Sequence, residues 1–281
     1  MRKTMSLAAP LCAVAALVVA EPSLERGEYL VEGPAGCGNC HTPIGPEGPM
    51  MEMNLAGRLV EETPAFTAIA PNITPGGRIA GWTDAEVIAS IREGITPGGE
   101  RVIGPPMPIA LYSRLSDDDV MSMVMYLRSL PAVENDPGTS VYNIPLPPAY
   151  GPPVESVAHP DESDTVAYGE YLAGPVAHCI ECHSPMGPMG PDWINQLGAG
   201  GFEFHGPWGV SVSSNLTSHP EDGIAEWTDA ELVTMITQGV RPDGSPMLPP
   251  MGYGYYARTS PEDIQAIIAY LRTLPPLPDP E

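Results

Sequence analysis

Two five-residue motifs, 142 residues apart, constrain this chain more than any other feature. The first is Cys37-Gly38-Asn39-Cys40-His41, and the second is Cys179-Ile180-Glu181-Cys182-His183. A C-x-x-C-H motif is typical of covalent c-type haem attachment, in which the cysteines bond the haem and the histidine becomes the proximal iron ligand. The sequence therefore predicts two covalently bound haem c groups and two iron centres.

Paired cysteines have two other common functions, and both fit this sequence less well. A redox dithiol is expected beside a βαβ pattern, which is absent around either pair. A structural zinc site brings two C-x-x-C pairs together over a short stretch, whereas these pairs are far apart and each is followed by histidine. Haem attachment remains the favoured interpretation.

The two motifs belong to a longer internal repeat. The matching segments are Gly27-Glu28-Tyr29-Leu30 with Gly169-Glu170-Tyr171-Leu172, Asn72-Ile73-Thr74 with Asn215-Leu216-Thr217, and Trp82-Thr83-Asp84-Ala85-Glu86 with Trp227-Thr228-Asp229-Ala230-Glu231. In the last pair, threonine followed by glutamate three positions later predicts a capping box at a helix start. Each half is therefore expected to fold as a similar unit.

The periodicity of the apolar residues is helical, and no strand pattern of useful length is evident. We predict an all-α fold made of two small helical domains. The expected boundaries are a signal peptide at 1–20, a first domain at 21–131, a proline-rich linker at 132–163, a second domain at 164–275 and a tail at 276–281. Tyr142, Ile144, Leu146 and Tyr150 suggest that the linker packs along both halves.

The N-terminus has the pattern of a secretory signal. Arg2 and Lys3 precede an apolar run from Leu7 to Ala20 that ends in small residues, with a cleavage site expected after Ala20. The run is short for a membrane span. The sequence predicts export to the periplasm, where membrane association would come only through a partner or an uncleaved N-terminus.

The net charge of −23 excludes one class of partner and favours another. An acidic chain is poorly suited to nucleic acid. An acidic surface can steer a basic redox partner, although solubility alone also accounts for such a charge. The fifth cysteine, Cys12, lies in the signal segment, so the mature chain has no cysteine outside the two motifs.

The second axial ligand of each iron decides between electron transfer and catalysis. Alignment of the two halves places Pro105-Pro106-Met107 opposite Pro249-Pro250-Met251. A thioether is a soft ligand, and proline restricts the backbone that would present it. We predict His41 and Met107 as ligands of one iron and His183 and Met251 as ligands of the other. Met247 is the nearest rival of Met251.

Taken together, these motifs resemble class I c-type cytochromes, repeated twice. The Asn72 segment, the Trp-Thr-Asp-Ala-Glu segments and the Pro-Pro-Met loops are most similar to those of the cytochrome subunits of membrane-bound alcohol and sugar-acid dehydrogenases. Those subunits commonly carry three haems, whereas this chain has two motifs. The resemblance implies that the terminal helices of each domain cross, with Tyr29 and Tyr126, and Tyr171 and Tyr270, near the crossings.

The expected function is electron transfer without catalysis. The chain would relay single electrons from a dehydrogenase or other respiratory donor to a downstream acceptor, such as a terminal oxidase. Two alternatives stay open: a di-haem peroxidase in which one iron can open a coordination site, and a subunit whose main role is to dock a dehydrogenase. A thiosulfate-oxidising cytochrome is disfavoured because that family uses an extra cysteine as a ligand.

Overall fold

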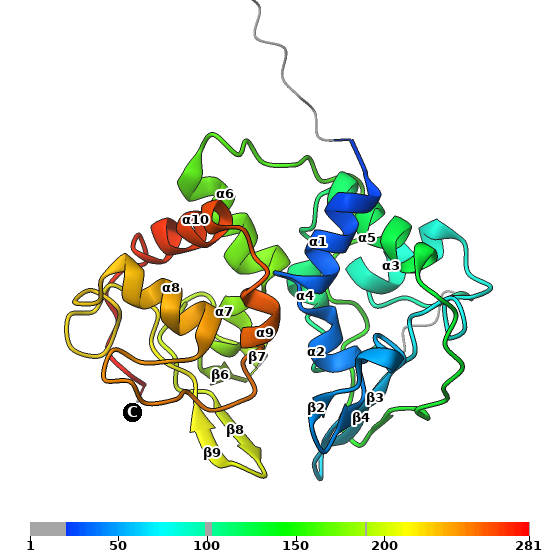
Figure 1. Cartoon of the computed structure of the whole chain (residues 1–281), viewed down its shortest axis with the longest axis horizontal. Helices are drawn as coiled ribbons and strands as arrows, with labels where there is room; N and C mark the ends of the chain where they lie inside the picture. The colour runs from blue at the N-terminus through cyan, green and yellow to red at the C-terminus, as the bar shows by residue number, and fades with distance from the viewer. Residues whose placement is uncertain (1–20, 99–102, 189, 281) are drawn as a thin grey trace, which may run out of the picture.

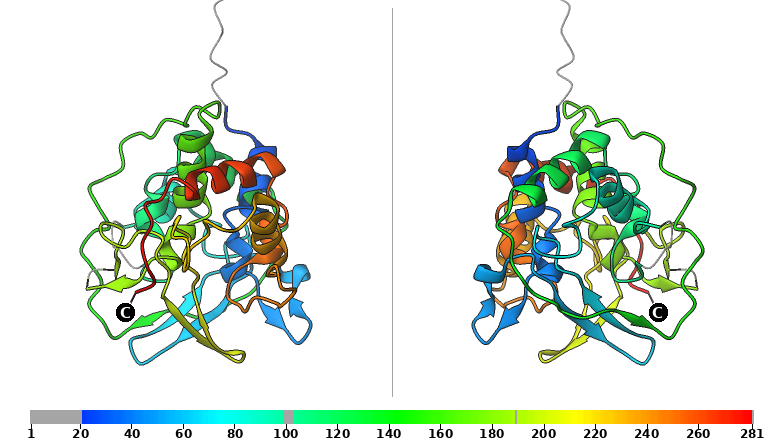
Figure 2. Two further views of the ribbon diagram at one scale, coloured as in Figure 1. Left: turned by 90° about the vertical axis from the view of Figure 1, so that its left-hand side faces the viewer. Right: turned by 90° about the vertical axis from the view of Figure 1, so that its right-hand side faces the viewer.

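The computed structural model describes residues 21–98, 103–188 and 190–280. The predicted signal peptide, residues 1–20, lies outside the described residues. Two halves of similar build lie side by side, and the extended segment after α5 crosses from the first half to the second (Figure 1). The hairpins of both halves project at the end of the molecule away from this crossing, which side views also show (Figure 2).

The described helices occur in the same order in the two halves. The first half contains α1 (Leu24–Glu32), α2 (Cys37–His41), the 3₁₀ turn η1 (Met51–Met53), α3 (Asp84–Arg92), α4 (Ile109–Tyr112) and α5 (Asp117–Ser129). The second half contains α6 (Thr165–Tyr171), its π-helical continuation η2 (Leu172–Val176), α7 (Cys179–Cys182), α8 (Asp229–Gln238), α9 (Tyr253–Tyr256) and α10 (Pro261–Leu271).

The predicted capping boxes are confirmed in both halves. The Thr83 hydroxyl accepts a hydrogen bond from the backbone N–H of Glu86, whose carboxylate accepts one from the N–H of Thr83. Thr228 and Glu231 repeat this arrangement at the start of α8. Each box satisfies two backbone donors that a helix start leaves unpaired, which explains why α3 and α8 begin where they do.

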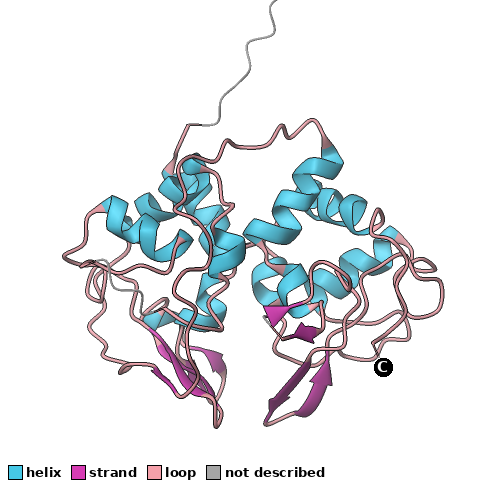
Figure 3. Ribbon diagram, turned by 180° about the vertical axis from the view of Figure 1, so that it is seen from behind, coloured by secondary structure: helices cyan, strands magenta, loops and turns pink. Residues whose placement is uncertain are grey.

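The prediction of an all-α fold is wrong. Of the residues that the structure describes, only 33% are helical and 12% are in strands. The strands form small antiparallel sheets, gathered at the end of the molecule away from the crossing segment (Figure 3). They are β1 (Ile44–Gly45), β2 (Gly48–Pro49), β3 (Arg58–Glu62), β4 (Phe66–Ala70), β5 (Val141–Tyr142), β6 (Met186–Gly187), β7 (Gly190–Pro191), β8 (Glu203–Gly206) and β9 (Gly209–Val212).

The strands were missed because they are short and lie within glycine- and proline-rich loops. Strand β3 pairs with β4 through Arg58↔Ala70, with an irregularity after Leu59 that interrupts the alternation of side chains. The third strand of this sheet, β5, comes from the predicted linker and pairs Tyr142 with Phe66. A pairing between segments so distant in sequence leaves no local pattern to detect.

Each half is built on a close crossing of its first and last long helices, α1 with α5 and α6 with α10. A Cβ atom added to Gly27 would overlap the carbonyl oxygen of Ser122, and one added to Gly169 would overlap that of Ala266. Glycine therefore permits the two helix backbones to touch. Around each crossing, buried apolar side chains form the core, among them Leu30, Val124, Leu172, Ile264 and Ile268.

An arginine at the end of each last helix ties that helix to the turn before the capping box. The guanidinium of Arg128 donates to the carbonyl oxygens of Ile79, at 2.6 Å, and Trp82. Arg272 donates in the same way to Ile224, at 3.4 Å, and Trp227, at 2.6 Å. The repeated tryptophan segment is thus held against the helix crossing through its backbone.

The two halves meet through reciprocal tyrosine contacts. The hydroxyl of Tyr29, in the first half, donates to Asp263 at 2.5 Å and accepts from the backbone N–H of Ser260 at 3.1 Å. The hydroxyl of Tyr171, in the second half, donates to Asp119 at 2.6 Å and accepts from the N–H of Ser116 at 3.1 Å. Each half therefore caps the final helix of the other.

These contacts correct the expectation for the tyrosines. Tyr126 and Tyr270 do lie at the helix crossings, since their Cβ atoms are 2.9 Å and 3.0 Å from a Cβ added at Gly27 and Gly169. Tyr29 and Tyr171 instead reach across to the opposite half. They make hydrogen bonds that a single isolated domain would leave unmade.

Candidate haem sites

The two C-x-x-C-H motifs form short helices in equivalent positions. Cys37 and Cys40 lie on α2, and Cys179 and Cys182 lie on α7. All four thiols are free and partly buried, and none of these described cysteines forms a disulfide. Each motif begins after a left-handed residue, Gly36 at φ 55° and His178 at φ 44°. The cysteines are thus presented as two separate pairs, as covalent attachment of two haems requires.

The motif histidines are held in the orientation expected of metal ligands. The Nδ1–H of His41 donates to the carbonyl oxygen of Pro71 at 2.8 Å, and that of His183 donates to Ser214 at 2.6 Å. A hydrogen bond at Nδ1 leaves the lone pair of Nε2 free for iron. Burial lowers the pKa of His41 to about 4 and also lowers the pKa of His183, so both rings are neutral near pH 7.

The repeated Asn-x-Thr segments hold the carbonyl groups that bind these histidines. Asn72, which follows Pro71, donates to the carbonyl oxygen of Val133 at 2.7 Å and accepts from the N–H of Thr74 at 3.0 Å. Asn215, which follows Ser214, makes the same contacts with Leu277, at 2.8 Å, and Thr217, at 2.9 Å. The repetition of Asn-x-Thr was the sequence signal, but its link to the motif histidines was not predicted.

The first site also contains an unpaired donor. The side chain of Arg58 donates from Nη2 to the carbonyl oxygen of Asn39 at 2.8 Å, while its buried Nε has no hydrogen-bond partner among the described residues. A buried donor without a partner is unfavourable, and a carboxylate is a suitable acceptor for it. Haem carries propionate carboxylates, so Arg58 fits the group that the cysteines and histidine would hold.

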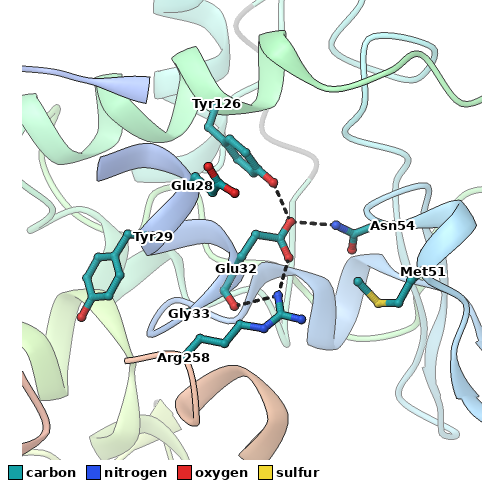
Figure 4. A pocket seen from close by; sticks show the side chains of 8 residues that line it. All are labelled: Glu28, Tyr29, Glu32, Gly33, Met51, Asn54, Tyr126 and Arg258. Atoms are coloured by element: carbon teal, nitrogen blue, oxygen red, sulfur yellow. Dashed lines mark hydrogen bonds and ion pairs between the residues drawn. The ribbon is translucent and has the colours of Figure 1, made fainter. Parts of the chain in front are cut away.

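A pocket of about 400 Å³ opens beside the first site, where the halves meet (Figure 4). Its centre is Glu32, which accepts hydrogen bonds from Asn54 at 2.7 Å and Tyr126 at 3.0 Å and pairs with Arg258 at 3.2 Å. Asn54 in turn accepts from Thr42, the residue after the motif histidine His41. The carboxylate is satisfied by the protein, so this network supports α2 and connects it to the second half.

The two predicted methionine ligands lie at equivalent places. Met107 and Met251 each precede a short helix by two residues, and their carbonyl oxygens accept from the N–H of Ile109 at 2.8 Å and Tyr253 at 3.0 Å. Both side chains are partly buried. Met247 lies before this turn, where its N–H donates to Gly239 at 2.7 Å. The correspondence favours Met251 over Met247, while ligation itself stays a prediction.

The attachment helices of the two sites lie near one another. Tyr112 of α4 packs edge-on against His178 of the second site, with ring centroids 5.9 Å apart. Tyr255 of α9 packs against Gly36 and Gly38 of the first site. In both sites, therefore, residues at the motif contact the opposite half. They are Gly36 and Gly38 in the first site and His178 in the second.

The described residues include no group of three or more His, Cys, Asp and Glu side chains arranged to hold a metal ion. Within the same residues, no helix has both the length and the apolar character needed to cross a membrane.

Comparison with known proteins agrees with the resemblance seen in the sequence. No family model matches the chain. It is 28% identical to the cytochrome c subunit of a quinone alcohol dehydrogenase from Gluconobacter oxydans, over 92% of this chain and 56% of the relative. It is 30% identical to the fructose dehydrogenase cytochrome subunit of Gluconobacter japonicus, over 90% of this chain and 53% of the relative.

A third relative is similar along most of its own length. The chain is 27% identical to a diheme cytochrome c-type protein of Cereibacter sphaeroides, over 89% of this chain and 85% of the relative. The chain spans about half the length of the two dehydrogenase subunits. The predicted resemblance to dehydrogenase cytochrome subunits is confirmed, and these relatives are named as cytochromes and cytochrome subunits, which agrees with an electron carrier and not a catalytic enzyme.

Proposed function

We propose that the chain is an exported di-haem c-type cytochrome that relays single electrons from a dehydrogenase to a downstream acceptor. The observation that carries this proposal is the duplication of a complete site. Each half has a C-x-x-C-H helix, a histidine whose Nδ1 is engaged by a backbone carbonyl, and a methionine at an equivalent turn. Bound haem iron would supply one-electron chemistry.

The residues of the chain have separate tasks in this proposal. Cys37, Cys40, Cys179 and Cys182 hold the haems, and His41 and His183 bind from the proximal side. Met107 and Met251 complete the coordination, which would raise the potentials and exclude small ligands. A dehydrogenase partner is supported by the names of two relatives, which are cytochrome subunits of an alcohol dehydrogenase and a fructose dehydrogenase. A terminal oxidase or another carrier would accept the electrons.

Spectroscopy of the purified holoprotein tests the function and the ligands together. We expect a mass increase equal to two haems, and optical and magnetic spectra of two low-spin iron centres that reduce and reoxidise reversibly. A stable high-spin centre that turns over peroxide would contradict the carrier function and favour the peroxidase alternative.

Substitution of single methionines assigns the second site. Met251→Leu should convert one iron to a form that binds added imidazole and should lower its reduction potential, because a thioether ligand is lost. Met247→Leu, the matched control four residues earlier, should leave both spectra unchanged. The reverse result would make Met247 the ligand.

Export is tested at the N-terminus. Cell fractionation should recover the haem-loaded protein from the periplasm, and its N-terminal sequence should begin at Glu21 because the predicted cleavage follows Ala20. Recovery with Met1 retained would show that the segment instead remains on the protein.

A further inference from the structure

The carbonyl group two residues before each predicted methionine ligand accepts a hydrogen bond from a distant hydroxyl group. In the first half, the Tyr142 hydroxyl donates to the carbonyl oxygen of Pro105 at 2.9 Å. In the second half, the Ser211 hydroxyl donates to the carbonyl oxygen of Pro249 at 2.5 Å. Pro105 and Pro249 occupy the same position in the two Pro-Pro-Met segments, so the acceptor is repeated.

The two donors, by contrast, are not equivalent residues. Tyr142 lies on β5, which the segment after α5 adds to the sheet of the first half. Ser211 lies on β9, the second strand of the β8–β9 hairpin. When the halves are aligned on the Asn-x-Thr segments, Ser211 corresponds to Ala68 of β4, which has no hydroxyl group. A different strand therefore supplies the bond that Ala68 cannot make, which indicates that both loops need it.

Both hydroxyl groups are carried by residues that strand pairing fixes. Tyr142 pairs with Phe66 of β4, and their ring centroids are 5.9 Å apart. Ser211 pairs with Phe204 of β8. A donor that is already ordered loses little conformational entropy when it binds, so more of the hydrogen-bond energy is left to restrain the loop.

Met107 lies between two backbone attachment points. Pro105, two residues earlier, is bound by Tyr142, and the carbonyl oxygen of Met107 itself accepts from the N–H of Ile109 at 2.8 Å. The ring of Tyr142 also lies directly on the loop, since a Cβ atom added at Gly104 would be 2.7 Å from it. The loop backbone is therefore restrained on both sides of the residue that carries the thioether.

Met251 is restrained in the same two places. The hydroxyl group from β9 binds the carbonyl oxygen of Pro249, and the carbonyl oxygen of Met251 accepts from the N–H of Tyr253 at 3.0 Å. The side chain of Asn39, in the first half, adds a bond of 3.3 Å to the carbonyl oxygen of Pro250. The hydroxyl bond and the helix bond are thus common to the two loops.

A backbone restraint of this kind matters because a methionine side chain is flexible and uncharged. It has three rotatable bonds, so its own conformation does not fix the sulfur in front of an iron. An external ligand can take the place of a thioether only if the loop gives way. A bond that holds the loop therefore helps to keep the coordination site closed.

We propose that Tyr142 and Ser211 are positioning residues for the two predicted methionine ligands, in which Tyr142 holds the loop of Met107 and Ser211 holds the loop of Met251. This proposal rests on the proposed electron-carrier function, in which both methionines are axial ligands. Each hydroxyl group protects one iron from external ligands and has no effect on the other iron.

Titration of the oxidised holoprotein with imidazole measures how firmly each loop is held. A nitrogen of imidazole binds the iron as the thioether leaves, and no electron is transferred. The loop must move and break the bond to its hydroxyl group, so earlier removal of that bond favours imidazole. Tyr142→Phe should raise the imidazole affinity of the first iron about fivefold, and Ser211→Ala should do the same at the second, because each removes one hydrogen bond of ordinary strength.

Each iron can be observed alone when the methionine of the other is replaced. In Met251→Leu the second iron binds imidazole at low concentration, so the later transition belongs to the first iron, and Met107→Leu gives the reverse. Tyr142→Phe and Ser211→Ala are each introduced into both backgrounds. A transition that shifts at the wrong iron, or at neither iron, would overturn the positioning roles.

Asn143→Ala and Ser211→Thr are the matched controls. The side chain of Asn143 donates to the carbonyl oxygen of Pro64 at 3.1 Å, so its replacement removes one hydrogen bond from the segment of Tyr142 without touching the methionine loop. Its imidazole affinity should stay within about twofold of the parent value. Ser211→Thr keeps the hydroxyl group and should keep the parent affinity. If Asn143→Ala matched Tyr142→Phe, general loosening of the segment would explain the result and the positioning role would be wrong.

The ligand assignment and the positioning roles fail in different ways. If Met107→Leu or Met251→Leu left its iron low-spin and closed to imidazole, that methionine would not be a ligand, and its positioning residue would be refuted with it. If both variants open their irons while Tyr142→Phe and Ser211→Ala leave the imidazole affinities unchanged, only the positioning roles are refuted. Reversible cycling of both irons in a spectroelectrochemical titration tests the electron-carrier function independently of either result.

Discussion

Gly169→Ala is expected to lower the free energy of unfolding of the holoprotein by about 3 kcal/mol. The added Cβ would overlap the carbonyl oxygen of Ala266 and lie 3.0 Å from the Cβ of Tyr270. A carbonyl within a helix is fixed by its own hydrogen bonds, so α6 and α10 must separate and the core between them must loosen. Gly27→Ala should do the same to α1 and α5, since its Cβ would overlap the carbonyl oxygen of Ser122.

Chemical unfolding followed by haem absorbance and far-ultraviolet circular dichroism measures this loss. Gly254→Ala in α9 is the control, because a Cβ at that position meets nothing within 4 Å. That variant should stay within about 0.5 kcal/mol of the parent, since an exposed helical glycine gains helix propensity when it becomes alanine. If Gly169→Ala were as mild as Gly254→Ala, the close crossing of α6 and α10 would be incorrect.

The crossing glycines illustrate what could be read from the sequence. Gly27 and Gly169 recur at the same offset as the two haem motifs, so their place in a repeated helix was predictable. The capping boxes at Thr83 and Thr228 were predictable as well, because they depend on residues three positions apart. Features that depend on residues close together in the sequence can be recognised without knowledge of the tertiary fold.

The strands and the contacts between halves depend on distant residues and were not predictable. Strand β5 pairs with β4 across about seventy-five residues, through Phe66 and Tyr142. The bond from Tyr171 to Asp119 joins different repeats, whereas the resemblance to class I cytochromes implied that each tyrosine lies at the helix crossing of its own domain. The sequence does repeat both partners of these contacts, since Tyr171 corresponds to Tyr29 and Asp263 corresponds to Asp119.

The candidate sites divide in the same way. The cysteines and histidines of the two motifs follow from their spacing, and the methionines follow from alignment of the repeats. The carbonyl groups of Pro71 and Ser214, which orient the histidines, could not be identified because any residue supplies a carbonyl. Only the neighbouring Asn72 and Asn215 carried a signal, as part of a repeated segment.

The reciprocal contacts between the halves are not equal, and the difference leads to a second prediction with a large effect. Asp119 is nearly fully buried and accepts two hydrogen bonds from Arg26, at 2.8 Å and 3.1 Å, besides the one from Tyr171. Asp263 accepts a hydrogen bond from Tyr29 in the same way, but the residue of the second half that corresponds to Arg26 is Tyr168. Asp119 therefore balances a partly buried positive charge, whereas Asp263 does not.

Asp119→Asn should destabilise the holoprotein by about 3 kcal/mol, because it leaves the guanidinium of Arg26 in the interface without a counter-charge. Asp263→Asn, the matched control, removes no ion pair and should cost about 1 kcal/mol, the usual value for a hydrogen bond. Unfolding midpoints of both variants, measured beside the parent protein, test the difference. Equal losses would show that the ion pair adds nothing to the tyrosine contacts.

The dependence of stability on pH gives this prediction an independent check. Burial alone would raise the pKa of Asp119, but hydrogen bonds from His159 and Arg26 hold it below its usual range. The carboxylate therefore contributes stability above about pH 4, and this contribution is lost as the pH falls through the lowered pKa. The same contact raises the pKa of His159, so the contribution of that ring is complete below about pH 6.5 and is lost as the pH rises.

The other titratable groups around this contact are Glu162, 3.1 Å from the ring of His159, and the phenols of Tyr168 and Tyr171, whose pKa values burial raises. Because these phenols stay neutral, the titrating groups of this contact are Asp119, whose contribution changes below about pH 4, and His159, whose contribution changes above about pH 6.5. In Asp119→Asn the carboxylate is absent and His159 loses its main partner. The fall in stability at low pH and the fall at high pH, which form the two limbs of the profile, should therefore both become smaller. In Asp263→Asn the two limbs should persist, because that substitution leaves the contacts of Asp119 with Arg26 and His159 in place.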